Sequence, residues 1–133
     1  MLSFKYKLDE GTKQYYPRIP IVISSGTRNI AAAALLDSGS TGILIPKDIS
    51  EYLGLEIEKT EKSSVVGGTK VETGITAATI IIGKGSETYR HRLRVSVLMK
   101  GGSDLDILLG REFFQFYDIT FKEKSKEVIL KKI

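Results

Sequence analysis

The stretch that decides the fold is residues 34–46, which read ALLDSGSTGILIP. Two aliphatic runs, residues 30–36 and 43–45, flank a short polar segment that begins with Asp37. Aliphatic runs of this length, bounded by turn residues, are typical of buried strands. Gly39 permits a sharp bend and a close approach of the backbone. The pattern therefore predicts two core strands joined by a tight loop that carries a carboxylate.

The rest of the chain extends this pattern and predicts an all-β fold. Strands are expected over residues 19–23, 55–66, 70–82, 88–99 and 105–109, and as a terminal hairpin over 117–121 and 127–130. One helix is expected after Pro46, with Ile49, Tyr52 and Leu53 on one face and Gly54 at its end. One or two further helical turns are expected over residues 111–116.

The composition predicts a single domain spanning residues 1–133. With no cysteine and one histidine, the chain has no disulfide, no thiolate metal site and no multi-histidine metal site. The net charge of +4 comes from 20 basic and 16 acidic residues that are interspersed, which predicts a solvated basic surface. The low amide content hints at a thermophilic source. We expect a cytoplasmic protein without membrane contact, because no apolar leader or membrane-length run is present.

Asp, Ser and Gly are ordinary turn residues, so the Asp37 loop by itself is compatible with a simple turn. Its setting favours a more specific use, because surface turns are rarely flanked on both sides by strands this apolar. Backbone N–H groups and the hydroxyls of Ser38 and Ser40 are placed in the sequence to converge on the carboxylate. An acid held in this way has a fixed orientation.

Three segments resemble a known family. Residues 35–41, LLDSGST, resemble the active-site loop of aspartic proteases, and residues 106–114, DILLGREFF, resemble the second signature of that family. Residues 65–69, VVGGT, lie between them, where the family carries its flap hairpin. The order and spacing resemble the single-lobe, retropepsin-like branch, over roughly residues 19–130.

The resemblance implies a closed β-barrel with one or two short helices that acts as a homodimer. It further implies an aspartic endopeptidase without cofactor or metal, in which two carboxyls activate one water molecule between them. The chain has a single Asp-Ser-Gly loop, and neither Asp104 nor Asp106 lies in a Gly-centred loop. The second carboxyl is therefore expected to be Asp37 of another copy, and the expected substrate is a peptide or an unfolded protein.

The resemblance also assigns roles around Asp37, the expected acid and base. Ser38 would join the two loops across the dimer, Gly39 would admit the substrate, and Ser40 would donate a hydrogen bond to the Asp37 carboxylate. Gly110 would support the loop.

Val66, Gly67, Gly68 and Thr69 are either a flap over the peptide or an ordinary hairpin turn. Arg111 would support the loop with Gly110, but Thr41 and Gly42 occupy the stretch where the family carries acidic residues, one of which pairs with this arginine. Its partner is then Glu112, Asp118 or solvent. Residues 126–133 supply either a strand of an interleaved dimer sheet or an edge strand within one subunit.

The sequence also allows two other functions to be weighed against a protease. A catalytically silent domain of the same fold would serve as a dimerisation or peptide-binding module. Arg90, Arg92 and Arg94 form a basic row that would suit phosphates, but no aromatic residues interleave with it, so no nucleic-acid partner is expected. His91 is expected to be structural.

Overall fold

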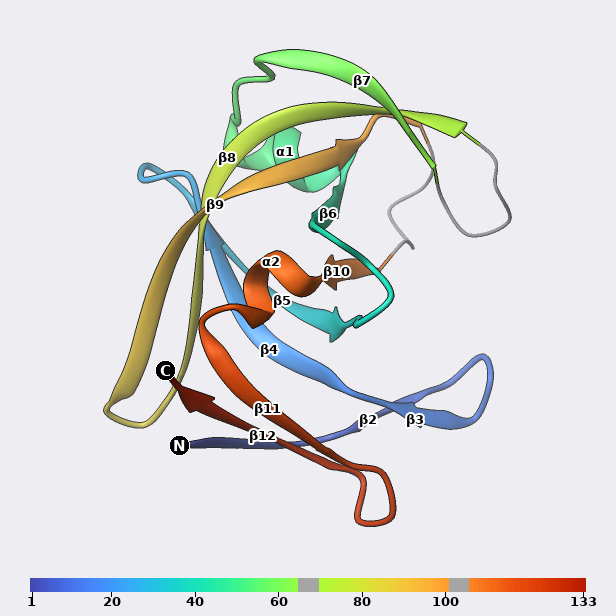
Figure 1. The fold of residues 1–133 in the computed structure, drawn as a ribbon. Coiled ribbons are helices and arrows are strands. Elements are labelled where there is room, and N and C mark those ends of the chain that lie inside the picture. Colours follow the sequence, from blue (N-terminus) through green and yellow to red (C-terminus); the bar gives the residue numbers. More distant parts are fainter. Residues whose placement is uncertain (65–69, 101–105) are drawn as a thin grey trace.

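The aliphatic runs of the sequence form the strands of the computed structural model, which describes residues 1–64, 70–100 and 106–133 (Figure 1). The elements are β1 (Leu2–Lys5), β2 (Lys7–Asp9), β3 (Gln14–Tyr16), β4 (Arg18–Ser24), β5 (Asn29–Leu36), β6 (Ile43–Pro46), α1 (Lys47–Leu53), β7 (Lys59–Ser64), β8 (Lys70–Lys84), β9 (Glu87–Leu98), β10 (Ile107–Leu109), α2 (Arg111–Phe114), β11 (Tyr117–Lys122) and β12 (Glu127–Lys132).

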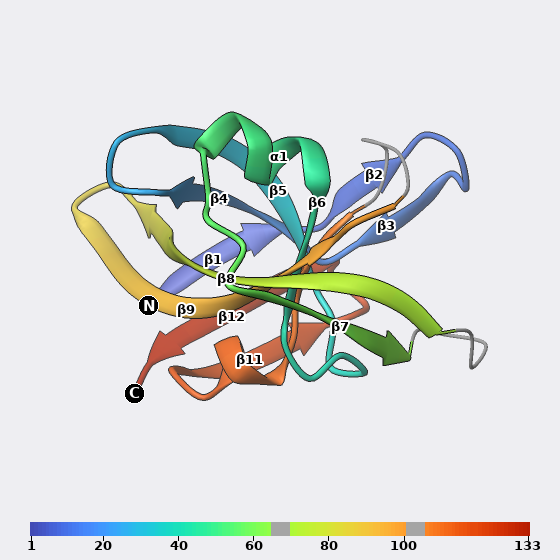
Figure 2. The ribbon, with the colours of Figure 1, turned by 90° about the horizontal axis from the view of Figure 1, so that it is seen from above.

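Six strands form a ring of hydrogen bonds in the order β4, β5, β10, β6, β9, β8 and back to β4. The ring is completed by the antiparallel pairing of β4 with β8, in which Ile23 lies opposite Ile80. β7 is added outside the ring as the antiparallel neighbour of β8. This ring confirms the mostly β architecture that the sequence predicts, and α1 and the β11–β12 hairpin lie on opposite sides of it (Figures 1 and 2).

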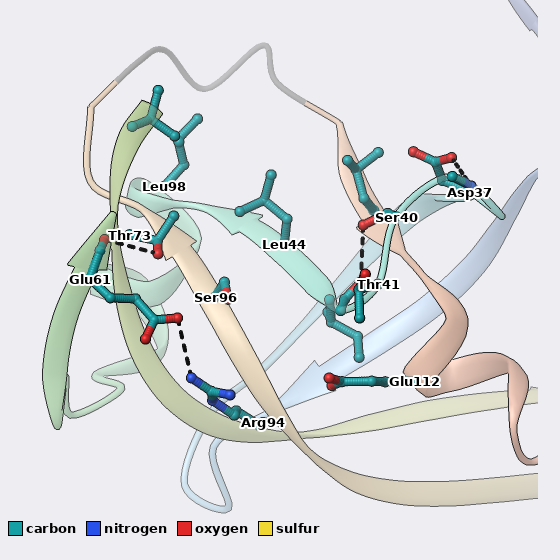
Figure 3. Close-up of a pocket in the computed structure, with 15 residues that line it drawn as sticks. Asp37, Ser40, Thr41, Leu44, Glu61, Thr73, Arg94, Ser96, Leu98 and Glu112 are labelled. Atoms are coloured by element: carbon teal, nitrogen blue, oxygen red, sulfur yellow. Dashed lines mark hydrogen bonds and ion pairs between the residues drawn. The ribbon is translucent and has the colours of Figure 1, made fainter. Parts of the chain in front are cut away.

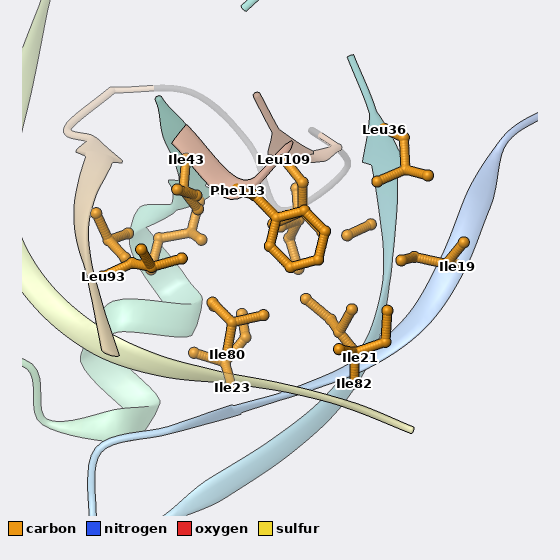
Figure 4. Packing of buried hydrophobic residues seen from close by; sticks show 14 of the residues in the cluster. Ile19, Ile21, Ile23, Leu36, Ile43, Ile80, Ile82, Leu93, Leu109 and Phe113 are labelled. Atoms are coloured by element: carbon orange, nitrogen blue, oxygen red, sulfur yellow. The ribbon is translucent and has the colours of Figure 1, made fainter. Parts of the chain in front are cut away.

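The interior of the ring is filled by the inward face of each strand (Figure 4). Ile19, Ile21 and Ile23 alternate with outward residues on β4, and all three are buried. Phe113 of α2 is fully buried among them and is one of the largest buried side chains. Burying an aromatic or aliphatic side chain of this size contributes about 1.5–3 kcal/mol relative to leaving it in water. Phe113 thereby fastens α2, and the loop that α2 contacts, to the core.

Two similar segments, residues 34–36 and 107–109, lie side by side in the ring. β5 and β10 are parallel and in register, with Leu35 opposite Leu108 and Leu36 opposite Leu109. Both strands end at the same level, so the residues that follow them, Asp37 and Gly110, emerge together. The position of the site follows from this pairing.

The helix α1 begins after Pro46 and ends at Gly54, as predicted, and the φ of +68° at Gly54 is the left-handed conformation of a helix C-terminus. Leu53 is buried and Ile49 packs against the core. Tyr52, predicted on the same helix face, is 52% exposed, so that face is only partly buried. Its ring lies under the Arg28 guanidinium, 5.6 Å from the ring centre, which gives it a partner outside the core.

Two predictions need correction, and one part of the fold was not predicted. Residues 55–58 are not part of a strand, and β7 begins only at Lys59. The N-terminal strands β1, β2 and β3 were not expected from the sequence, because they are short and largely polar outside β1. β12 is neither an interleaved strand nor an edge strand, since it is the central strand of the sheet β1–β12–β11, with both edges paired within one chain.

The single histidine of the chain, His91, lies on β9 and contacts β11. His91 is 8% exposed, its Nε2 lies 2.6 Å from the Tyr117 hydroxyl, and its ring stacks on Phe116 at 4.3 Å between centres. Burial lowers the pKa of His91, and the positive charge of Lys132 lowers it further. Burial raises the pKa of Tyr117, so the phenol stays neutral. His91 is a structural residue, as expected.

We predict that this histidine makes the fold less stable as the pH falls. The pKa of His91 in the folded chain lies below the value of 6.5 of a free histidine. Below about pH 6.5 the unfolded chain therefore binds the proton more readily, and protonation favours unfolding. The free energy of unfolding of the wild type should decrease from pH 7 to pH 5, whereas His91→Gln, which does not titrate there, should show a flatter profile. Urea titrations measure both, and parallel profiles would contradict the assignment.

Candidate active site

The Asp37 loop begins where β5 ends and is held in place by its own backbone. The Asp37 N–H donates to the Leu109 carbonyl at 3.0 Å, and the Ser40 N–H donates to the Asp37 carbonyl at 3.1 Å. The Gly39 N–H donates to Oδ1 of the Asp37 carboxylate at 2.9 Å. These bonds fix both the backbone and the orientation of the carboxylate, whose side chain is half-buried.

A second segment, residues 110–112 at the start of α2, holds the far side of the loop. The N–H groups of Gly110, Arg111 and Glu112 donate to the carbonyls of Gly42, Ser40 and Thr41, respectively, each at 2.9 Å. The first N–H groups of a helix have no partner inside the helix. Here they find their acceptors on the loop, so the helix start and the loop satisfy each other.

This contact requires a glycine at position 110. A Cβ at Gly110 would collide with the backbone carbonyls of Ser40 and Gly42. The colliding atoms belong to the backbone of the loop, so they cannot move aside without displacing Asp37. The role of Gly110 as support for the loop, expected from the sequence, has this steric basis.

Arg111 has a partner that the sequence did not predict. Its guanidinium Nη2 donates to the Thr41 hydroxyl at 3.2 Å, rather than to Glu112 or Asp118. The Thr41 hydroxyl provides an acceptor that carries no charge. Arg111 therefore still ties α2 to the loop.

The two serines of the loop behave differently from each other. The Ser40 hydroxyl donates to the Gly42 carbonyl at 3.4 Å, not to the Asp37 carboxylate as expected, and so it closes the loop on itself. Ser38 is exposed and makes no hydrogen bond within the described residues. A Cβ at Gly39 would lie 3.2 Å from Asp37 Oδ1, which is a crowded contact. Position 39 thus keeps space free beside the carboxylate.

The other acidic residue considered from the sequence has a structural partner. Asp106, just before β10, accepts from Nε and Nη2 of Arg18 at 3.1 and 3.0 Å. This bidentate pair raises the pKa of the Arg18 guanidinium, mainly through the hydrogen bond to Asp106. Asp104 lies outside the described residues, as do Val66, Gly67, Gly68 and Thr69.

Asp37 opens onto a cleft of about 450 Å³ (Figure 3). The Asp37 loop and β6 form one side, and β7, β8 and β9 form the other. Leu44, Leu98 and Leu108 line it with aliphatic groups. Asp37 lies at one end of this cleft (Figure 3).

The wall opposite Asp37 carries an ion pair that sequence reasoning missed. Nη2 of Arg94 on β9 lies 3.3 Å from Oε1 of Glu61 on β7, and the Thr73 hydroxyl donates to the Glu61 carbonyl at 3.4 Å. The basic row of Arg90, Arg92 and Arg94 is exposed, as predicted, but Arg94 is engaged by this carboxylate. Only the pairing of β7 with β8 brings Glu61 into reach, so local sequence carries no signal for it.

Within the described residues, no group of three or more histidine, aspartate or glutamate side chains is arranged to hold a metal ion. In the same part of the chain, no helix combines the length and hydrophobicity needed to span a membrane.

Comparison with known proteins places this site in context. A family model described as aspartyl protease matches residues 21–113, which is more than half of the chain. No curated protein sequence matches the chain significantly.

Solved structures share the fold. A retropepsin-like aspartic protease from Rickettsia conorii superposes with a TM-score of 0.62 at 17% identity, over 97% of this chain and 90% of that one. The EIAV protease in complex with the inhibitor HBY-793 superposes with a TM-score of 0.50 at 22% identity, over 84% and 92%. The retroviral protease-like domain of Ddi1 from Leishmania major gives 0.55 at 14% identity, over 89% and 90%. These structures have the same retropepsin-like fold as this chain.

We predict that Gly110→Ala destabilises the fold, because its Cβ would push against the backbone of the Asp37 loop. Overpacking of this kind costs about 1–3 kcal/mol. Gly11→Ala is the matched control, since a Cβ at Gly11 would meet only Asp9 Oδ2, at an ordinary 3.6 Å. The free energy of unfolding of Gly11→Ala should stay within about 0.5 kcal/mol of the wild-type value. Equal stabilities for the two variants in urea titrations would show that the loop is not clamped at Gly110.

Proposed function

This chain belongs to the aspartyl protease family, and we propose that it is an aspartic endopeptidase that works as a homodimer. Two copies of Asp37, one from each chain, would meet at a two-fold axis and hold one water molecule between them. The observation that carries the proposal is the placement of a single, clamped Asp37 carboxylate at the end of a cleft.

The dimer follows from the number of carboxylates that the chemistry needs. Peptide hydrolysis of this kind uses two carboxyls that share one proton, because like charges this close do not both ionise. Among the described carboxylates, Asp106 is bound to Arg18 and Glu61 to Arg94. Neither is available to join Asp37 from within the chain, and the Glu112 side chain lies beside Gly42, apart from Asp37 (Figure 3). Exposed Ser38, beside Asp37, is suited to contact the same loop of a second copy.

The proposed reaction proceeds in two steps. The ionised carboxylate accepts a proton from the water molecule, while the protonated one donates a hydrogen bond to the oxygen of the scissile carbonyl. The hydroxide forms a bond to the carbonyl carbon and gives a tetrahedral intermediate. The C–N bond then breaks as the leaving nitrogen receives a proton, and the pair returns to its singly protonated state.

The rest of the cleft would bind the peptide. Its aliphatic wall at Leu44, Leu98 and Leu108 suits the side chains of a peptide or an unfolded protein. The paired strands β7 and β8 form the far wall of the cleft, and Val66, Gly67, Gly68 and Thr69, which lie between these strands in the sequence, are proposed as a flap over the bound peptide. The alternative is a silent dimerisation or peptide-binding module of the same fold, which would bind peptides without cleaving them.

We predict that Asp37→Asn lowers cleavage of an unfolded protein substrate by about 10²–10⁴-fold, the contribution typical of a general acid or base. The assay should span about pH 4 to 7, where a carboxyl pair that shares a proton is active. Asp118→Asn is the matched control, because Asp118 is an exposed aspartate on β11 outside the cleft. Undiminished cleavage by Asp37→Asn would contradict the proposal. Peptide binding without cleavage by the wild type would favour the silent module.

We also predict that the Asp37→Asn chain inactivates wild-type chains by forming mixed dimers with them. When wild type is unfolded together with an equal amount of the variant and refolded, half of the wild-type chains pair with the variant. Activity per wild-type chain should then fall to about half, because each site needs two carboxyls. Wild type unfolded and refolded together with Asp118→Asn is the control for losses during refolding, because these mixed dimers keep both Asp37 carboxyls. Activity that does not change on mixing would mean that each chain acts alone.

A further inference from the structure

The cleft has an excess of negative charge, although the chain as a whole is positively charged. The chain carries a net charge of +4, whereas the cleft is lined by the carboxylates of Asp37, Glu61 and Glu112 and by one guanidinium, that of Arg94. Arg94 is paired with Glu61. The cleft therefore has one carboxylate, that of Glu112, which neither the proposed chemistry nor an ion pair uses.

Glu112 is held in place by its backbone while its side chain stays free. Its N–H donates to the Thr41 carbonyl at 2.9 Å, and its carbonyl accepts from the Gln115 amide at 2.8 Å. The side chain is half-buried and points into the cleft (Figure 3). Its carboxylate makes no hydrogen bond or ion pair within the described residues. Gly42 lies next to this carboxylate and has no side chain. A Cβ at position 42 would lie 3.8 Å from Oε2 of Glu112.

The neighbouring cations do not neutralise this carboxylate. Arg111 precedes Glu112 on α2, and adjacent helical residues point in different directions. The Arg111 guanidinium donates instead to the Thr41 hydroxyl at 3.2 Å. The Glu112 carboxylate therefore keeps its hydrogen-bonding capacity for a ligand, and a cationic group forms the strongest hydrogen bonds with a carboxylate.

We infer that Glu112 selects a basic side chain, lysine or arginine, at a position of the peptide that flanks the scissile bond. Such a side chain has an aliphatic stem and a charged end. The stem would pack on the wall at Leu44 and Leu108, and the charged end would donate hydrogen bonds to the Glu112 carboxylate. The inference rests on the proposed function, because it takes the cleft as the place where the peptide binds.

The test uses fluorescent peptides with a central statine, which cannot be cleaved, so that binding is measured apart from catalysis. Each position beside the statine carries either lysine or norleucine, which has the same aliphatic stem without the ammonium group. At one position at least, lysine should strengthen binding to the wild type about tenfold, which corresponds to about 1.4 kcal/mol. Fluorescence anisotropy at low ionic strength gives the dissociation constants.

Glu112→Gln should reduce this preference to less than about twofold, because the amide keeps the shape but loses the charge. Asp118→Asn should retain the full preference, since Asp118 lies outside the cleft. Circular dichroism of the two variants verifies that both are folded.

The inference is overturned if no position favours lysine, if Glu112→Gln keeps the preference, or if the wild type binds none of these peptides. The same peptides with an ordinary amide bond in place of statine test the proposed function separately. Lysine-selective binding that depends on Glu112, without any cleavage, would overturn the proposed protease activity and leave the role of Glu112 intact.

Discussion

The structure depends on one contact between the start of α2 and the Asp37 loop. Three backbone N–H groups, those of Gly110, Arg111 and Glu112, donate to three consecutive carbonyls of the loop, from Ser40 to Gly42. Each such bond contributes about 0.5–1.5 kcal/mol net, and leaving these groups unpaired in the interior would cost more. Phe113 anchors α2 in the core. Because α2 is hydrogen-bonded to the loop, the position of the Asp37 carboxylate is fixed relative to the core. An acid that must meet another at hydrogen-bonding distance needs this kind of support.

The same contact accounts for the arrangement of the proposed site, to which each chain would contribute one acid, Asp37, and the residues that support it. The parallel pair β5 and β10 brings Asp37 and Gly110 to the same end of the ring, so one strand supplies the acid and the other supplies its support. Within the described residues, the carboxylates of Asp106 and Glu61 are paired with arginines, so the proposal takes the second acid from another copy of the chain. β12 does not supply an interleaved strand for a dimer, because both of its edges are paired within one chain. The proposed dimer would therefore meet at the Asp37 loops.

The sequence predicted those parts of the molecule that local patterns determine. The strands on either side of Asp37, the helix end at Gly54 and the terminal hairpin all follow from alternation and turn residues over a few positions. The support at Gly110 followed from the resemblance alone, and its steric reason needed the structure. Three features depended on pairing between distant segments and were missed: the Thr41 hydroxyl as the partner of Arg111, the Glu61–Arg94 ion pair and the central position of β12. No pattern within a short window records which strands will become neighbours.

The most direct test of this account is the distance between the two Asp37 carboxyls in a crystal structure of the assembled protein. The account predicts a two-fold symmetric dimer in which oxygens of the two carboxyls lie about 2.6–3.2 Å apart, within reach of one water molecule. An assembly in solution and in the crystal that leaves the two Asp37 side chains on separate surfaces would contradict it.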